Sequence, residues 1–157
     1  MKKLSIITPC YNEEVNVEIC AQELKKVMAH HLPNYKYEHI FADNASTDST
    51  LVKLRKIASK DANVKVISNS RNVGPFRNMW NAMKSATGDA VVPLLPADLQ
   101  DPPSVIPELV KNWEAGFLVT YGVRANREES LVMRMARGLY YLIIKKFAAA
   151  VIPLNSG

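Results

Sequence analysis

Short apolar runs alternate with amphipathic segments along most of this sequence, and no other feature constrains the fold as much. The apolar runs predict strands at 4–8, 37–42, 64–67, 90–95 and 117–123. The segments between them have apolar residues at helical spacing and predict helices at about 15–30, 47–59, 75–86 and 101–115. Strands joined by helices through short loops are typical of parallel sheets. The sequence therefore predicts an α/β fold, a mostly parallel central sheet with helices on both faces.

Single residues mark several of these boundaries. Ser46 is a residue type that caps helix N-termini, so we expect it to start the helix over 47–59. Pro75 suits the first turn of the next helix, where its missing N–H costs nothing, and Gly88 ends that helix. Pro93 cannot donate to a sheet ladder, which places the strand at 90–95 at a sheet edge or beside a bulge.

The last part of the sequence, 124–157, differs from the rest. Residues 129–151 predict a helix whose apolar side chains cover most of its circumference, interrupted by arginines and lysines. The sequence then stops at a polar turn with no further strand. We therefore expect an α/β domain at 1–123, followed by a basic, apolar helical segment at 124–157. This segment would begin an acceptor-side part that the sequence leaves incomplete at the C-terminus.

Composition excludes several classes of protein. The chain has 157 residues, 48% of them hydrophobic and 22% charged, which is typical of one soluble domain. Two cysteines, Cys10 and Cys20, are too few for a disulfide scaffold or a zinc module, and they favour a reducing, cytoplasmic compartment. No leader sequence or membrane-spanning segment is predicted. Residues 124–157 carry +4 of the net charge of +5, so the positive charge is local.

Four polar clusters follow the predicted strands, at 9–13, 43–48, 70–74 and 96–101. In a parallel sheet the carboxyl ends of the strands meet at one edge, where ligands bind. The sequence has no GxGxxG and no GxxxxGK[ST] motif, so neither a dinucleotide site nor a P-loop is predicted. No serine or cysteine nucleophile is paired with a histidine in these clusters. The four polar clusters must therefore serve a different kind of ligand or reaction.

The side chains in these clusters suit a ligand with a nucleotide end. Carboxylate or amide oxygens after the second strand can accept a base N–H. Tyr11 and Glu13 can hold the base and the ribose, and Arg71 can donate to a phosphate. Asp98 and Gln100 offer the oxygen ligands that Mg²⁺ or Mn²⁺ takes alongside a phosphate.

Four motifs, in this order, carry a family resemblance: SIITPCYNEE, ADNASTDST, SRNVG and PADLQDPP. Together they resemble the inverting GT-A-fold glycosyltransferases, and most closely the polyprenyl-phosphate branch that includes dolichyl-phosphate mannose synthase and bacterial undecaprenyl-phosphate glycosyltransferases. The resemblance covers essentially the whole sequence. It implies a GT-A-like fold and a metal-dependent transfer of sugar from a UDP- or GDP-linked donor. The implied acceptor is a polyprenyl phosphate, as a lipid phosphate, or a glycan.

The resemblance also implies roles for particular residues. The residues implied to bind the nucleotide sugar are Pro9, Tyr11, Glu13, Asp43, Asn44, Arg71, Ala97 and Asp98. Within this set, Asp43 and Asn44 would read the base. Asp98 and Gln100 would hold a Mg²⁺ or Mn²⁺ ion bound to the diphosphate. No catalytic residue is expected within this sequence, because the general base would lie beyond Gly157.

Two positions depart from the family pattern. Pro96 stands where the DxD motif usually has its first aspartate, so one ribose or metal contact is lost while Asp98 remains. Asn44 stands where many members have the second of two aspartates. This change is milder, because an amide oxygen still accepts a base N–H.

Other interpretations stay open from the sequence. The chain can be a nucleotide-binding or interaction module without turnover, since Pro96 and the missing base both weaken the case for catalysis. The polar clusters can be ordinary helix-capping turns. The helix predicted at 129–151 has three possible roles: it can pack on a missing second half, rest on an anionic membrane at the cytoplasmic face, or drive self-association. The strands do not interleave aromatic and basic residues, which argues against a nucleic-acid partner.

Overall fold

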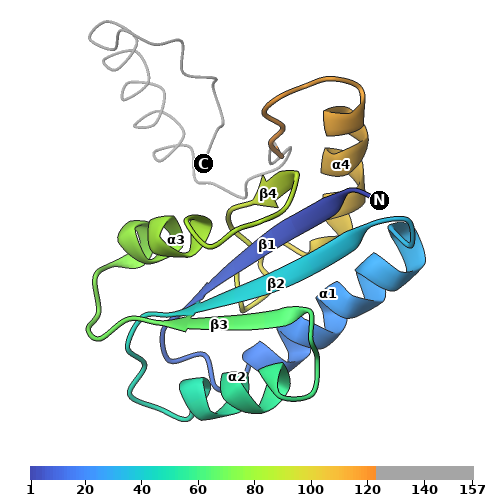
Figure 1. The fold of residues 1–157 in the computed structure, drawn as a ribbon. Coiled ribbons are helices and arrows are strands. Elements are labelled where there is room, and N and C mark those ends of the chain that lie inside the picture. Colours follow the sequence, from blue (N-terminus) through green and yellow to red (C-terminus); the bar gives the residue numbers. More distant parts are fainter. Residues whose placement is uncertain (123–157) are drawn as a thin grey trace, which may run out of the picture. The chain divides into compact units, whose positions relative to one another are not determined.

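The computed structural model of the protein describes residues 1–122. They belong to two compact units, Met1–Lys111 and Asn112–Gly157. The strands are β1 (Lys3–Cys10), β2 (Lys36–Asp43), β3 (Val64–Ser68) and β4 (Ala90–Val92). The helices are α1 (Val17–His31), α2 (Thr50–Ala58), α3 (Pro75–Met83), the short 3₁₀ helix η1 (Pro103–Val105) and α4 (Ile106–Glu114) (Figure 1).

The four described strands form one sheet in the order β3-β2-β1-β4, and every neighbouring pair is parallel. β1 and β2 pair along their whole length, from Lys3 opposite Lys36 to Cys10 opposite Asp43. Because all strands point the same way, the loops that follow them lie at one edge of the sheet. The predicted α/β fold with a mostly parallel sheet is confirmed.

Helices cover both faces of the sheet, as predicted (Figure 1). α3 packs on the face that carries Ile7, Ile40 and Ala42, where Ala82 is fully buried against them. α1 and α2 lie side by side on the opposite face, where Leu54 of α2 is fully buried. Successive strand residues point to opposite faces, and β1 and β2 are buried over most of their length, so both of their faces are covered. The two helical layers hold the edge loops on a rigid base.

Several helix boundaries differ from the prediction, and those of α2 and α3 differ by three residues. Ser46 does not cap a helix, because α2 begins only at Thr50. The Ser46 hydroxyl instead accepts the Asn12 N–H from the loop after β1, at 3.0 Å. α3 ends at Met83, before the predicted end at 86. In the first case a contact between two loops overrides the local capping signal.

The strand predicted at 90–95 is shorter than expected. β4 ends at Val92, immediately before Pro93, and lies at an edge of the sheet that the described strands form. The Leu95 N–H still donates to the Ile7 carbonyl at 2.8 Å. The chain therefore stays alongside β1 beyond the proline, which carries the next loop toward the end of β1.

The prediction of a last strand at 117–123 is wrong. Residues 117–122 form no strand, α4 ends at Glu114, and Gly116 follows with a φ of 100°. The Phe117 N–H donates to the Asn112 carbonyl at 3.3 Å, which closes the end of α4. The helix predicted at 129–151, like the rest of 124–157, lies outside the described residues. Up to residue 122, no helix is long and apolar enough to cross a membrane.

A buried ionic cluster ties three strands together. Glu38 on β2 is 2% exposed and accepts hydrogen bonds from Lys3 on β1 (2.8 Å) and Lys65 on β3 (2.6 Å). Its other carboxylate oxygen accepts the Ser5 hydroxyl (2.6 Å) and the Thr87 backbone N–H (2.7 Å). Burial alone raises the pKa of Glu38, but these hydrogen bonds outweigh burial and hold the pKa well below its usual range.

The turn before β4 passes very close to β1. A Cβ added at Gly88 would lie 2.7 Å from the Ser5 nitrogen and 2.8 Å from the Lys3 carbonyl oxygen, which are both backbone atoms. Gly88 is therefore required here by the close approach of two backbone segments. Any larger residue has to push the turn away from the sheet.

Candidate functional site

Two of the loops at the carboxyl edge of the sheet are joined to each other by polar contacts. The Asn12 side-chain oxygen accepts the Thr47 N–H at 2.9 Å, and the Asn12 N–H donates to Ser46 at 3.0 Å. One residue further on, the Glu13 N–H donates to the Thr50 hydroxyl at 2.8 Å. The loop after β1 and the loop after β2 therefore form a single unit.

Glu14 and Asp48 form further hydrogen bonds between these two loops. The Glu14 carboxylate accepts the Ser49 N–H at 2.9 Å, and the Asp48 carboxylate accepts the Glu14 N–H at 3.3 Å. Burial raises the pKa of Asp48, but hydrogen bonds from Thr50 and Glu14 outweigh it and lower the pKa overall. Both carboxylates therefore accept hydrogen bonds from the backbone of the loops and hold the two loops together.

Each of the four loops at this edge contains one residue in the left-handed region. These residues are Asn12 (φ 57°), Ala45 (φ 61°), Gly74 (φ 83°) and Leu99 (φ 58°). For residues other than glycine this conformation costs of the order of 1 kcal/mol each. Strain of this kind gathers at ligand sites, where the surrounding structure holds it in place.

A cavity of 190 Å³ opens between the first three loops. It is lined by Pro9, Cys10, Tyr11, Asn44, Asn72, Pro75 and Asn78. Tyr11 is 46% exposed, so its ring is available to a ligand, whereas Asn44 and Asn78 are almost fully buried. Three residues implied by the resemblance, namely Pro9, Tyr11 and Asn44, therefore share one cavity.

Asp43 and Asn44, at the end of β2, are both engaged with protein groups. One Asp43 oxygen accepts the Ser46 N–H (3.2 Å) and the other accepts the Ser68 hydroxyl (3.0 Å). The Asn44 oxygen accepts the Val73 N–H at 3.0 Å. Asp43 is 1% exposed and Asn44 is 3% exposed, so neither presents much surface to a ligand.

Two buried cysteines, Cys10 at the end of β1 and Cys20 on α1, have raised pKa values. Burial raises the pKa of Cys10 far above its usual value, and the charges of Cys20, Glu13 and Asp43 add to this effect. Burial raises the pKa of Cys20 to about 11, with further contributions from Glu13 and Asp98. Glu13, Asp43 and Asp98 thus act on the same pair of free thiols. The hydrogen bond from the Leu95 N–H to the Ile7 carbonyl brings the start of the loop after β4 alongside β1.

Asp98 and Gln100 can supply only part of a metal site. One Asp98 oxygen accepts the backbone N–H of Gln100 at 3.1 Å, in a turn that passes through Leu99. Both side chains are exposed, and no group of three or more metal-binding residues exists within 1–122. An exposed carboxylate oxygen and an amide oxygen suit Mg²⁺ or Mn²⁺, which complete their coordination with substrate phosphate and water. The donor set fits an ion that arrives with a diphosphate.

The two remaining implied residues lie in different surroundings. Ala97 is 4% exposed, so it presents little surface to a ligand. Arg71, in the loop after β3, is exposed, and within 1–122 its guanidinium makes no ion pair or side-chain hydrogen bond. A charged donor with no protein partner is available to an anionic ligand.

The sequence reasoning missed Asn72, Asn78 and Asn69. Asn72 and Asn78 line the cavity, and Asn69 hydrogen-bonds to both Asn44 (3.2 Å) and Asn78 (2.8 Å). The sequence does carry a signal, because asparagines recur at 69, 72, 78 and 81 in a stretch that also contains Arg71 and Arg77. Amides in this density indicate a hydrogen-bonded network.

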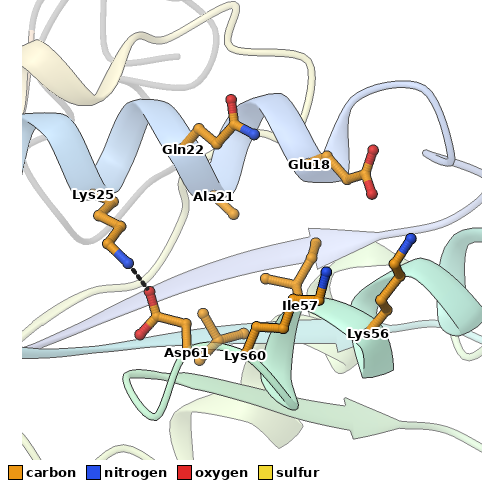
Figure 2. A pocket seen from close by; sticks show the side chains of 9 residues that line it. Glu18, Ala21, Gln22, Lys25, Lys56, Ile57, Lys60 and Asp61 are labelled. Carbon is orange, nitrogen blue, oxygen red and sulfur yellow. Dashed lines mark hydrogen bonds and ion pairs between the residues drawn. The ribbon is translucent and has the colours of Figure 1, made fainter.

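A second cavity, of 280 Å³, lies between α1 and α2 (Figure 2). Its apolar lining is Ala21, Ile57 and Val64, and an ion pair between Lys25 and Asp61 (2.7 Å) crosses one end. None of the residues implied by the resemblance lines it. This cleft is separate from the site at the strand ends.

Solved structures share the fold. The mannosyltransferase PcManGT from Pyrobaculum calidifontis, in complex with GDP-Man and Mn²⁺, aligns with a TM-score of 0.63 at 25% identity, over 77% of this chain and 35% of that one. Glucosyl-3-phosphoglycerate synthase from Mycobacterium tuberculosis, in complex with Mn²⁺, UDP and phosphoglyceric acid, aligns with a TM-score of 0.61 at 24% identity, over 98% and 53% of the two chains. The fold is that of the GT-A glycosyltransferases, as the motifs implied.

Sequence relatives make the assignment more specific. Residues 5–155 match Glycosyl transferase family 2, and the chain belongs to this family. It is 35% identical to the uncharacterized glycosyltransferase YkcC of Bacillus subtilis, over 98% of this chain and 47% of YkcC. It is 30% identical to the prophage bactoprenol glucosyl transferase homolog of Escherichia coli, over 99% of this chain and 50% of that protein. The chain spans about half the length of these curated relatives.

Proposed function

We propose that this chain is the donor-binding part of a metal-dependent glycosyltransferase, which transfers a sugar from a nucleoside-diphosphate sugar to a polyprenyl phosphate. The observation that supports this most is the arrangement at the carboxyl edge of the sheet. An exposed tyrosine, an arginine without a side-chain partner among residues 1–122, and an exposed carboxylate come from three separate loops there. These are Tyr11, Arg71 and Asp98. Together they offer a surface for a base, a donor for a phosphate and a ligand for a cation.

Each side chain has a distinct task in this proposal. The Tyr11 ring packs against the nucleoside, beside Pro9 in the same cavity. Asp43 accepts the Ser46 N–H of the loop after β2 and the Ser68 hydroxyl at the end of β3, and so ties this loop to β3. The Arg71 guanidinium donates to the diphosphate oxygens and stabilises their charge.

Asp98 and Gln100 would hold Mg²⁺ or Mn²⁺ together with the diphosphate. When bound, the ion neutralises the negative charge that develops on the departing diphosphate. The left-handed conformation of Leu99 keeps the two side chains on one short turn. Because Pro96 has no oxygen ligand in its side chain, the protein contributes fewer contacts to the ion than a motif with two aspartates does.

The proposed acceptor rests on the relatives. Several proteins that are 30% identical to this chain are named bactoprenol glucosyl transferases, and this chain covers 50% of their length. A lipid-phosphate acceptor places the reaction at a membrane surface, and we propose the cytoplasmic face. A binding module without turnover is the second candidate, because Pro96 leaves a reduced metal site.

A nucleotide titration tests the proposal. Calorimetry of the purified chain with UDP and with GDP, with and without Mn²⁺, should show binding of one nucleotide that strengthens with the ion. Asp98→Ala should weaken binding in Mn²⁺ about tenfold, which corresponds to the loss of one charged ligand. Glu108→Ala removes an exposed carboxylate on α4 and serves as the matched control, with affinity unchanged.

Three results would decide between the candidates. If neither nucleotide binds at millimolar concentration, the donor site is refuted. If a nucleotide binds equally well without the ion and in Asp98→Ala, the metal role of Asp98 is refuted. Transfer of labelled sugar from the donor to a polyprenyl phosphate by the full-length protein would favour the enzyme over the binding module.

A further inference from the structure

Four asparagine carboxamides form a continuous chain of hydrogen bonds behind the cavity. These four residues, Asn44, Asn69, Asn72 and Asn78, are called the asparagine network below. They come from the end of β2, the loop after β3 and helix α3. The network therefore joins helix α3 to the end of β2 and to the loop after β3.

The chain of contacts starts at the backbone of β2. The Asn78 Nδ2 donates to the Ala42 carbonyl at 2.7 Å, and Asn78 Oδ1 accepts from Asn69 Nδ2 at 2.8 Å. Asn69 Nδ2 also donates to Asn44 Oδ1 at 3.2 Å. Asn44 Nδ2 then donates to Asn72 Oδ1 at 2.9 Å.

The network ends on the backbone of the loop after β3. Asn44 Oδ1 accepts the Val73 N–H at 3.0 Å, and Asn72 Oδ1 accepts the Gly74 N–H at 2.9 Å. Gly74 caps the N-terminus of α3, the helix that carries Asn78. The hydrogen bonds thus run in a closed circuit from α3 to β2 and back to the start of α3.

Asn78 is the least replaceable member of this circuit. It is 2% exposed, and its neighbours on α3 that face the sheet are apolar. A buried carboxamide is tolerated in such surroundings only when it is hydrogen-bonded. Without the Asn78 side chain, the Ala42 carbonyl loses its side-chain donor and Asn69 loses its acceptor on the helix.

We propose that Asn78 is a positioning residue, which fixes the wall of the nucleotide cavity by holding the asparagine network and the loop over Val73 and Gly74 in one arrangement. This proposal rests on the proposed function for the identity of the ligand. Asn78 acts through Asn69 and Asn44, and Asn44 donates to Asn72, which lines the cavity together with Tyr11.

The test compares three variants of the chain. Asn78→Ala should raise the dissociation constant for the nucleotide about tenfold, and should speed amide hydrogen exchange at Val73 and Gly74 about tenfold, because buried hydrogen bonds are lost. Asn81→Ala makes the same change one turn further along α3. Asn81 is exposed and reaches Asn69 only at 3.4 Å, so it should change both quantities less than about twofold.

Leu54→Ala separates positioning from general loss of stability. Leu54 is fully buried on the opposite face of the sheet, so its truncation lowers the melting temperature by a core cavity. It should leave both the affinity and the exchange at Val73 and Gly74 unchanged at temperatures where the chain is folded.

The two readouts keep the outcomes distinct. Faster exchange and weaker binding in Asn78→Ala alone would support the proposal. If the wild-type chain binds no nucleotide, the proposed function fails. The exchange rates at Val73 and Gly74 still test whether Asn78 holds this loop in place. Unchanged exchange at Val73 and Gly74 in Asn78→Ala would overturn the positioning role, as would equal effects in Leu54→Ala.

Discussion

The buried carboxylate of Glu38 offers the sharpest test of how the sheet is held together. Its oxygens accept hydrogen bonds from two lysines and two polar groups, on β1, β3 and the turn before β4. Glu38→Ala removes all of these acceptors at once. It leaves the Lys3 ammonium, which is 31% exposed, and the Ser5 hydroxyl, which is fully buried, without their main partner.

The magnitude follows from the burial of the cluster. Removing one partner of a buried ion pair costs about 3–5 kcal/mol, because the opposite charge is left without compensation. Lys3 and Lys65 are partly exposed and regain some hydration, so the lower end of this range applies. We expect Glu38→Ala to lower the free energy of unfolding by about 3 kcal/mol, a large part of the 5–15 kcal/mol typical of a domain.

Urea denaturation at pH 7 measures this loss, and Glu23→Ala is the matched control. Glu23 pairs with Lys26 at 2.7 Å on the surface of α1, where the exposed ion pair contributes about 0–0.5 kcal/mol. A loss below about 1 kcal/mol in Glu38→Ala would refute the reasoning. So would equal losses in the two variants.

The pH dependence of the same cluster provides a second check. The folded-state pKa of Glu38 lies below the value of about 4.3 expected in the unfolded chain. Its contribution to stability is therefore fully present above pH 4.3 and is lost as the pH falls toward the folded-state pKa. Glu38→Gln should lack this loss between about pH 4.3 and pH 2. An identical acid slope in wild type and Glu38→Gln would show that other carboxylates account for it.

Two further perturbations have definite expected outcomes. Gly88→Ala should lower the free energy of unfolding by about 1–3 kcal/mol in thermal melts, because its Cβ would lie within 3 Å of the Ser5 and Lys3 backbones, and an unchanged melt would contradict this. Burial lowers the pKa of His39 to about 3, so the unfolded chain binds a proton below about pH 6.5 that the folded chain does not. Stability should fall by about 1.4 kcal/mol per pH unit between these values in wild type but not in His39→Gln, and parallel profiles would exclude His39 as the cause.

The order of strands and helices was predictable because each buried element carries its own periodic pattern. In a run such as Leu4–Ser5–Ile6–Ile7 every residue is buried, which is typical of a strand in the centre of a sheet that is covered on both faces. The strand predicted at 117–123 failed because an apolar run says nothing about whether a neighbouring strand exists to pair with it. The Phe117 N–H is used by the end of α4 instead.

The location of the site was predictable from the sequence, whereas the roles of its individual residues were less so. Parallel topology brings the four loops to one edge, so clusters far apart in the sequence meet there. What individual polar residues do there depends on contacts between loops. Ser46 bonds Asn12 rather than capping α2, and Asn44 bonds Val73 within the protein. A residue type alone cannot distinguish a side chain that faces a ligand from one that holds the wall behind it.

The left-handed residues in the loops limit which sequences can share this binding edge. Valine and isoleucine are poorly tolerated at positions 12, 45 and 99, where φ is close to +60°, whatever their effect on a ligand. Glycine, asparagine and aspartate adopt this conformation at lower cost. Substitutions at these three positions should therefore be judged first by backbone geometry, because a β-branched residue there adds strain to the loop before any effect on a ligand.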